Sequence, residues 1–170
     1  KTLGRIYPGF LCIIKITKTK LLMKKFDLIV IGAGSGLSVS STMASQGWKV
    51  AIVEPSAFGG TCLNRGCIPS KMLIHAADIV EQIKSAKKFG IKTKYEGIDF
   101  KSLVNRVSST VDKEAEQILD GNKNNSNITV YQETAKFLES KVIQVGKEKI
   151  TAEKIVIAAG GRPFVPPIPG

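Results

Sequence analysis

The feature that most constrains this chain is a glycine-rich turn between two apolar segments. Residues 26–31 form an apolar run that is typical of a buried parallel strand. The run ends in a turn at residues 32–36, which reads Gly-Ala-Gly-Ser-Gly. Residues 38–46 are predicted to form a helix of small residues, and residues 48–54 a second strand. Strand, helix and strand within about 30 residues predict the βαβ unit of a dinucleotide-binding fold.

The glycines and one acidic residue of this unit predict its binding chemistry. Side chains at Gly32, Gly34 and Gly36 would keep a diphosphate away from the backbone N–H groups and the positive end of the following helix. The usual pattern has its third glycine at position 37, where this chain has Leu37. Glu54 ends the second strand, where a carboxylate can accept a hydrogen bond from a ribose hydroxyl. The alternative is a turn that uses glycine only for tightness, with Glu54 as a solvated strand end.

The rest of the chain predicts further helices and short strands. Helices are expected at residues 69–88 and 100–120, followed by a polar turn at residues 121–127. A small antiparallel meander is expected from short alternating segments at residues 129–131, 135–138, 142–145 and 150–152. A further buried strand is expected at residues 154–158. We therefore predict an α/β fold with a parallel central sheet and a small meander, in which residues 23–170 form the N-terminal part of an incomplete domain.

Most of the excess positive charge lies near the N-terminus. The formal net charge is +11, but residues 1–25 hold seven Lys or Arg and no acid, which leaves 18 basic against 14 acidic residues elsewhere. We therefore expect no nucleic-acid partner. We interpret Met23 as the natural start and residues 1–22 as a non-native or disordered extension. A targeting signal is the alternative, but the apolar run at residues 9–14 is too short to span a bilayer, so we expect no membrane partner and a cytoplasmic location.

The most specific motif surrounds two of the three cysteines. Residues 59–71 read Gly-Gly-Thr-Cys-Leu-Asn-Arg-Gly-Cys-Ile-Pro-Ser-Lys, whereas Cys12 lies in the N-terminal extension. A regular helix would place the Cα atoms of Cys62 and Cys67 about 8 Å apart. A disulfide tolerates only about 4.4–6.8 Å, so a bridge would need a distorted backbone, which Gly66 permits. The start of a helix at this point would also help to lower a thiolate pKa.

Two alternatives to a redox pair are two buried thiols and half of a metal site. Zinc usually takes four ligands, and the single histidine is His75, one helical turn after Lys71. We expect no metal and an ordinary helical role for His75. A secreted disulfide scaffold would need more cysteines, so a catalytic pair in a cytoplasmic protein is the favoured interpretation.

The glycine-rich unit and the cysteine motif together resemble the class I pyridine nucleotide–disulfide oxidoreductases, over roughly residues 24–170. This resemblance implies a Rossmann-like FAD-binding domain and a redox-active disulfide between Cys62 and Cys67. The motif looks most like that of dihydrolipoyl dehydrogenases, because glutathione reductases usually have Lys where this chain has Ser70. The implied reaction is oxidation of protein-bound dihydrolipoamide, with electrons passing through the disulfide and FAD to NAD+. The alternatives are a mercuric, mycothione or glutathione-type reductase, and a non-catalytic FAD-binding module.

The resemblance also implies roles for individual residues. Cys62 would exchange with a lipoyl-bearing protein or a small disulfide substrate, and Cys67 would face the flavin as the charge-transfer thiolate. Lys71 would lie near the isoalloxazine ring. The backbone at Ala135 would approach the adenine, and Ala159 stands where the family usually has Thr in a second flavin-contacting turn. The residues implied for the FAD site are Gly32, Gly34, Gly36, Glu54, Gly60, Thr61, Lys71, Ala135, Ala159 and Gly160.

Members of this family continue well beyond the residues present in this chain. The resemblance implies an NAD(P)-binding domain, a second part of the FAD domain and a dimer-interface domain that supplies a His–Glu acid/base pair across a homodimer. We therefore expect this chain to be a fragment of a longer enzyme and to be inactive alone.

Overall fold

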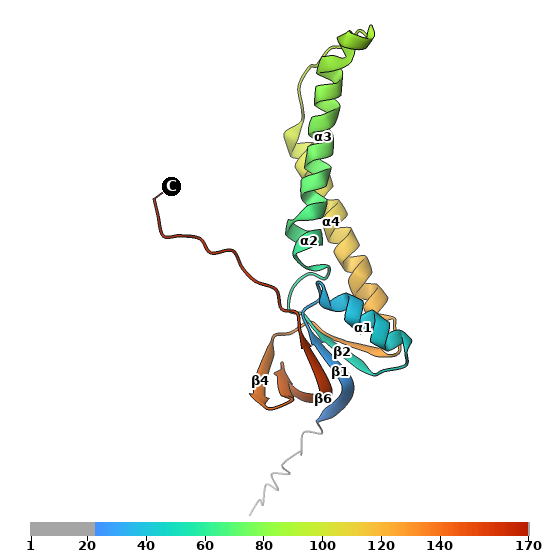
Figure 1. Ribbon diagram of the computed structural model, residues 1–170, viewed down its shortest axis with the longest axis vertical. Helices are drawn as coiled ribbons and strands as arrows, with labels where there is room; N and C mark the ends of the chain where they lie inside the picture. Colours follow the sequence, from blue (N-terminus) through green and yellow to red (C-terminus); the bar gives the residue numbers. More distant parts are fainter. Residues whose placement is uncertain (1–22, 170) are drawn as a thin grey trace, which may run out of the picture.

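A single six-stranded sheet organises the chain (Figure 1). The structure is a computed structural model that describes residues 23–169, so the predicted extension and Cys12 lie outside the described residues. The order of strands across the sheet is β3-β2-β1-β6-β5-β4. In chain order the elements are β1 (Lys24–Ile31), α1 (Gly36–Ser45), β2 (Val50–Val53), α2 (Gly60–Arg65), α3 (Cys67–Ser85), the 3₁₀ helix η1 (Ala86–Phe89), α4 (Phe100–Lys123), β3 (Ile128–Tyr131), β4 (Ala135–Glu139), β5 (Val142–Val145) and β6 (Glu148–Ile157).

The parallel part of the sheet confirms the predicted βαβ unit. β1 lies between β2 and β6 and pairs in parallel with both, and β2 pairs in parallel with β3. The centre of β1 is buried at Leu28, Ile29 and Val30, and β2 is buried along its whole length. Continuous apolar runs are what a strand covered on both faces requires.

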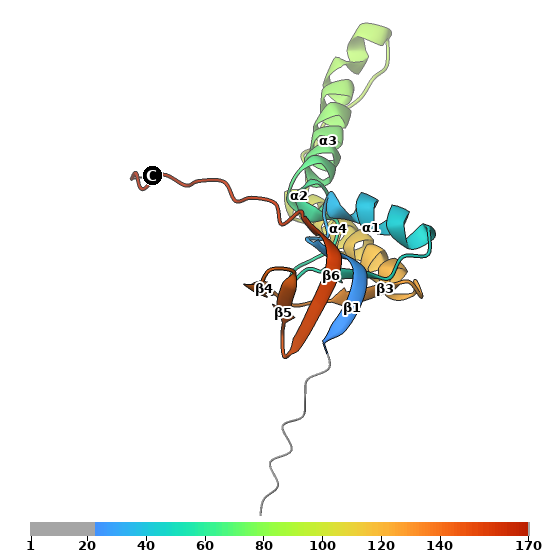
Figure 2. The same cartoon turned by 60° about the horizontal axis from the view of Figure 1, so that its bottom comes forward.

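Each face of the parallel strands has its own core. On one face, Val30 and Phe58 belong to a cluster that also packs against side chains of α1 and α4. Figure 2 shows both helices on the same side of the strands. On the other face, Ile29 packs with Ile143 and Ile150 of the antiparallel strands. The antiparallel strands therefore cover the face that the helices leave free.

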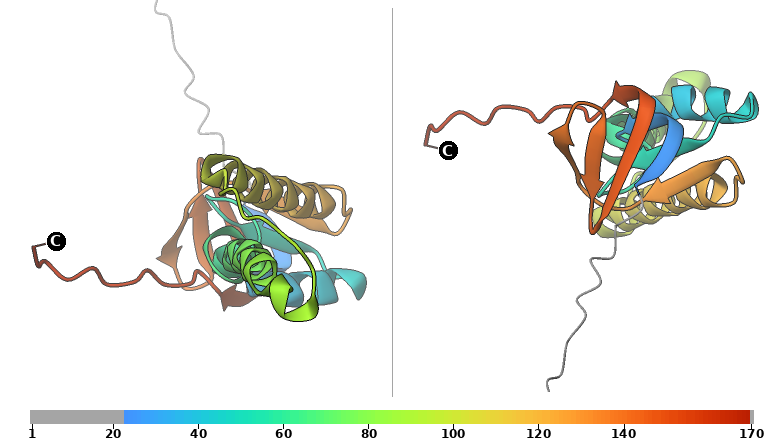
Figure 3. Two further views of the ribbon diagram at one scale, coloured as in Figure 1. Left: turned by 90° about the horizontal axis from the view of Figure 1, so that it is seen from above. Right: turned by 90° about the horizontal axis from the view of Figure 1, so that it is seen from below.

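Helices α3 and α4 form an arm that projects from the sheet (Figure 1). Figure 3 shows the two helices side by side when they are viewed from above. At the base of the arm, Leu63 of α2 packs with Val111 and Ala115 of α4. The last part of α4 returns to the sheet, where Ile118 packs against the helical core. No helix within residues 23–169 is both long and apolar enough to cross a lipid bilayer.

The meander differs from the prediction in two places. Residues 128–131 pair in parallel with β2 and do not belong to the antiparallel part. Residues 150–157 lie in one continuous strand, β6, which pairs antiparallel with β5 and parallel with β1. Only Glu153 separated the two predicted segments, and its exposed side chain does not interrupt the backbone of the strand. The residues on both sides of it, Ala152 and Lys154, pair with β1, so pairing with this neighbour overrides the local polarity.

The two long helices are confirmed with shifted boundaries. The helix expected from residue 69 begins at Cys67 and ends before η1, which a left-handed Gly90 (φ +75°) terminates. The helix expected at residues 100–120 continues to Lys123, which shortens the predicted polar turn. Its start is fixed by Asp99, whose carboxylate accepts a hydrogen bond from the Ser102 amide at 2.9 Å.

The first residue of α1 fits its place only without a side chain. A Cβ atom on Gly36 would lie 2.6 Å from Val30 Cγ1 and 3.1 Å from Ala158 Cβ. α1 therefore packs directly on β1 and on the end of β6 at this residue. Gly36 supplies the close helix–strand approach that the third glycine of the usual pattern provides, which explains why Leu37 is accommodated at the next position.

We predict that Gly36→Ala lowers the free energy of unfolding of the full chain by about 1–3 kcal/mol, the usual cost of overpacking. Gly121→Ala is the control, because a Cβ atom at Gly121 would meet nothing within 4 Å. Alanine is favoured over glycine inside a helix by about 1 kcal/mol, so this control should be neutral or stabilising. Urea denaturation followed by circular dichroism measures both variants. If Gly36→Ala were as stable as the unmodified chain, the tight packing of α1 would be contradicted.

Candidate functional site

Three loops meet at the carboxyl ends of the parallel strands. The turn after β1 is joined to β2 by a hydrogen bond from the Gly32 amide to the Val53 carbonyl at 2.8 Å. The Gly59 amide donates to the Ala33 carbonyl at 2.8 Å, which ties the loop before α2 to the same turn. After β6, the Ala158 amide donates to the Ile31 carbonyl at 2.7 Å. Crevices at the carboxyl ends of parallel strands are where ligands bind in folds of this kind.

The glycines predicted for the nucleotide site line this junction. A Cβ atom on Gly32, whose φ is +106°, would lie 2.1 Å from the Ala158 carbonyl oxygen. A Cβ atom on Gly60 would lie 2.6 Å from Gly34 Cα, so these two backbones touch. α1 starts at Gly36 with no side-chain cap and no acid in its first turn. Its positive end would therefore suit a diphosphate group, and binding at this turn stays a prediction.

Glu54 is bound more closely to the glycine turn than the sequence predicts. One carboxylate oxygen accepts a hydrogen bond from the Ala33 amide at 3.0 Å, and the other accepts from the Ser56 amide at 2.8 Å. The carboxylate is thus a brace for the turn, and the alternative of a merely solvated strand end is wrong. A carboxylate offers about four lone-pair positions, so two remain for a ribose hydroxyl.

The remaining predicted flavin contacts divide between two regions. Thr61 and Lys71 are exposed on α2 and α3, and Ala159 and Gly160 are exposed directly after β6. Ala135 belongs to a different element. It is the first residue of β4, at the edge of the sheet, and it packs against the core on the face opposite the helices. The structure therefore brings together the glycines, Glu54 and the segment after β6, and it positions Ala135 through a different element.

The two cysteines lie on either side of a break between two helices. Cys62 is inside α2, and Cys67 is the first residue of α3. Gly66 separates them with φ −134° and ψ −113°, outside the helical region, as the spacing predicted. A Cβ atom on Gly66 would lie 3.0 Å from the Thr61 carbonyl oxygen and 3.4 Å from Cys62 Cα. Glycine at this position thus allows the chain to fold back closely on α2.

Cys62 and Cys67 are both free, exposed thiols in the structure. The hydrogen bond with Cys67 raises the pKa of the Cys62 thiol, and partial desolvation adds to this effect, while the positive charge of Lys71 acts in the opposite direction. The prediction that a helix start helps to lower a thiolate pKa stays a prediction. The alternative of two buried thiols is also wrong, since both residues are exposed.

Two polar side chains stabilise this segment through hydrogen bonds that the sequence did not predict. The Asn64 side-chain amide donates to the Phe58 carbonyl at 3.0 Å and to the Gly60 carbonyl at 2.9 Å. The Ser70 hydroxyl donates to the Gly66 carbonyl at 2.5 Å, in the first turn of α3. An Asn four residues after a glycine-rich helix start is a signal for such a bond, because i and i+4 share one face of a helix.

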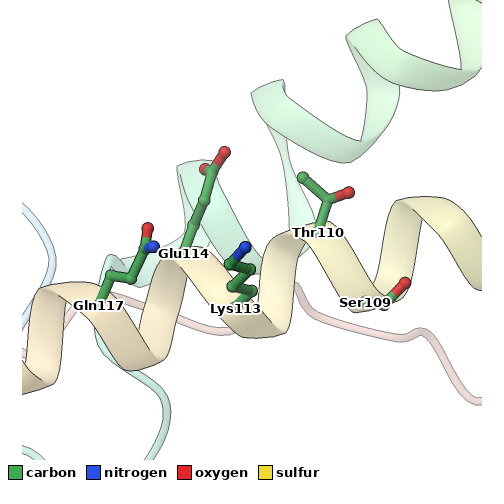
Figure 4. Close-up of a pocket in the computed structure, with 5 residues that line it drawn as sticks. All are labelled: Ser109, Thr110, Lys113, Glu114 and Gln117. Carbon is green, nitrogen blue, oxygen red and sulfur yellow. The ribbon is translucent and has the colours of Figure 1, made fainter.

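Other parts of the described chain offer no comparable cluster. Within residues 23–169, no three His, Cys, Asp or Glu residues lie close enough together to hold a metal ion, and His75 is exposed on α3. Figure 4 shows a surface depression whose lining comes from α4 alone, formed by Ser109, Thr110, Lys113, Glu114 and Gln117. The depression contains none of the cysteines or glycines of the predicted site, so the candidate site remains the junction at the carboxyl ends of the strands.

Comparison with known proteins identifies relatives along almost the whole chain. The model of a family described as pyridine nucleotide-disulphide oxidoreductase matches residues 26–170. A mycothione reductase from Mycobacterium tuberculosis is 38% identical over 154 residues, which cover 85% of this chain and 33% of the relative. A dihydrolipoyl dehydrogenase from Chlamydia muridarum is 40% identical over 142 residues, covering 81% and 30%. A glutathione reductase from Nostoc sp. is 34% identical over 146 residues, covering 85% and 32%. The chain thus spans about a third of the length of these curated relatives.

A solved structure agrees with these relatives. The HOCl-induced flavoprotein disulfide reductase RclA from Escherichia coli superposes with a TM-score of 0.70 at 32% identity, covering 85% of this chain and 30% of that chain. The predicted α/β fold, with a mostly parallel sheet and an antiparallel end, is confirmed. The relatives carry three different substrate names, so they identify the class of flavoprotein disulfide oxidoreductases and leave the substrate open.

The matched residues include the glycine turn, both cysteines and all six strands. Proteins of this kind bind FAD and use a pyridine nucleotide, which confirms the predicted flavin cofactor. This chain belongs to the pyridine nucleotide–disulphide oxidoreductase family.

Proposed function

We propose that this chain supplies the flavin-binding and dithiol part of an NAD-dependent dihydrolipoyl dehydrogenase. The longer parent enzyme would oxidise the dihydrolipoamide of a lipoyl-bearing protein and act as a homodimer. The observation that carries the proposal is the pair of exposed free thiols at Cys62 and Cys67, which lie on either side of a helix break beside the glycine junction. The choice of lipoamide as substrate follows from the sequence of residues 62–71, in which Ser70 stands where glutathione reductases usually have Lys.

The residues present fit FAD at the junction of the three loops. Gly32, Gly34 and Gly36 would hold the diphosphate at the start of α1, and Glu54 would accept the ribose hydroxyl. Further contacts would come from Gly60, Thr61, Lys71, Ala135, Ala159 and Gly160. When bound, FAD accepts an electron pair from the reduced cysteines and passes it on to NAD+.

The thiol chemistry assigns different tasks to the two cysteines. In the oxidised pair, a substrate thiolate attacks Cys62, which forms a mixed disulfide and breaks the Cys62–Cys67 bond so that Cys67 leaves as a thiolate. The second substrate thiol then attacks the substrate sulfur of the mixed disulfide, which closes the cyclic substrate disulfide and releases Cys62. The substrate loses two electrons and the cysteine pair gains them. The raised pKa of the Cys62 thiol favours its protonated form.

A mycothione reductase is the second candidate for the parent, since one such relative is 38% identical to this chain. The same cysteine chemistry would then run toward reduction of a small disulfide. The exposure of both thiols weighs against a third alternative, a module with inert cysteines, because inert structural cysteines are normally buried.

We predict that Gly34→Val weakens FAD binding by about 10- to 100-fold, because the new side chain collides with Gly60 and costs about 1–3 kcal/mol. The control is Gly121→Val, where a Cβ atom would meet nothing within 4 Å. Quenching of flavin fluorescence in a titration of the full chain measures the two affinities. Equal FAD affinities of Gly34→Val and Gly121→Val would show that the glycine turn is not part of the flavin site.

We also predict the pH dependence of alkylation at Cys62. In a Cys12→Ser chain kept reduced, Cys67→Ala should move the midpoint pH for alkylation of Cys62 downward, because it removes the hydrogen bond that raises the pKa of this thiol. Lys71→Ala should move it upward, since the positive charge that favours the Cys62 thiolate is lost. Peptide mass spectrometry after timed iodoacetamide treatment gives the rates. An unchanged midpoint in both variants would show that the two thiols do not act as a pair.

A further inference from the structure

We infer that Asn64 is a positioning residue that fixes the Cys62 thiol for disulfide exchange by tying α2 to the glycine junction; this inference rests on the redox role proposed above for the two cysteines. Asn64 lies two residues after Cys62 and three residues before Cys67. Its side chain touches neither sulfur in the structure, since its hydrogen bonds go to backbone carbonyls. It would act through the backbone that carries the cysteines.

The side-chain amide of Asn64 donates both to the loop before α2 and to the first residue of α2. It donates to the Phe58 carbonyl at 3.0 Å and to the Gly60 carbonyl at 2.9 Å. Asn64 is half-buried, and Phe58 is 1% exposed in the core under the helices. The first turn of α2 is therefore anchored to a fixed part of the fold by a side chain, in addition to its own helical bonds.

The same loop is fixed to the nucleotide turn from the other side. The Gly59 amide donates to the Ala33 carbonyl at 2.8 Å, and Gly60 touches Gly34 through its backbone. Asn64 thus completes a continuous connection from the turn at residues 32–36, through residues 58–60, to the helix that holds Cys62. Without the amide, the short α2, which has no side-chain cap, would keep this connection only through its backbone.

Positioning matters because exchange within a thiol pair depends on how closely the two sulfurs are held together. A side chain that narrows the range of Cys62 positions raises the effective concentration of one thiol at the other, which favours the disulfide over the dithiol. The net contribution of a typical hydrogen bond corresponds to a factor of about five in such an equilibrium. We expect loss of the Asn64 amide to reduce the stability of the Cys62–Cys67 disulfide by about this factor.

The test compares Asn64→Leu with Asn122→Leu in the full chain carrying Cys12→Ser. Asn122 is the matched control, because it is also half-buried and donates to the carbonyl four residues earlier, Ile118, at 2.8 Å on α4. Each chain is equilibrated without oxygen in mixtures of reduced and oxidised dithiothreitol, and the remaining thiols are trapped and counted by mass spectrometry. The expected result is an equilibrium constant for the Cys62–Cys67 disulfide about fivefold lower in Asn64→Leu and unchanged in Asn122→Leu.

Each outcome has one meaning. Equal constants for Asn64→Leu and the parent chain would overturn the positioning role, even if both substitutions lowered thermal stability. Failure of the parent chain itself to form a Cys62–Cys67 disulfide would instead overturn the proposed redox function. If Asn64→Leu does not fold, Asn64→Asp keeps the shape while its carboxylate cannot donate, and an unchanged constant in that variant also overturns the inference.

Discussion

The contact between Gly34 and Gly60 is the constraint on which the candidate site depends. A Cβ atom on Gly60 would lie 2.6 Å from Gly34 Cα, so neither residue can carry a side chain without moving the backbone. The contact joins the turn after β1 to the start of α2, two segments that the chain separates by a helix and a strand. The glycine turn that we propose as the flavin diphosphate site and the helix that carries Cys62 therefore occupy fixed positions relative to each other, which is the arrangement that electron transfer between a flavin and a dithiol requires.

The sheet and the helices contribute to the site in different ways. The centre of β1 and the whole of β2 are buried, and at their carboxyl ends Glu54 stabilises the glycine turn by accepting hydrogen bonds from two backbone amides. Helices α2 and α3 contribute a break in the helical backbone, because Gly66 interrupts them between the two cysteines. Exposed thiols on an interrupted helix remain accessible to a substrate, while the core on which α2 packs keeps them in place.

The sequence predicts those parts of the fold that local patterns encode. The apolar runs of β1 and β2, the glycine turn and the break at Gly66 follow from residue type and spacing alone. The sequence does not encode the extent of β6 in the same way, since the strand continues through exposed Glu153 because Ala152 and Lys154 on either side of it pair with β1. The bonds of Asn64 and the raised pKa of Cys62 depend on groups that meet only in the folded chain. The flavin-contacting residues remain predictions, because family membership assigns the cofactor and not the individual contacts.

The central claim is that this chain holds a flavin and a redox-active cysteine pair as one unit. The most direct measurement is an anaerobic reductive titration of the flavin-loaded chain with dithionite, in which absorbance follows the electrons taken up per bound flavin. Because a disulfide and a flavin each accept an electron pair, the account predicts an uptake of about four electrons per flavin. An uptake of about two electrons, with both cysteines unreactive throughout, would contradict it.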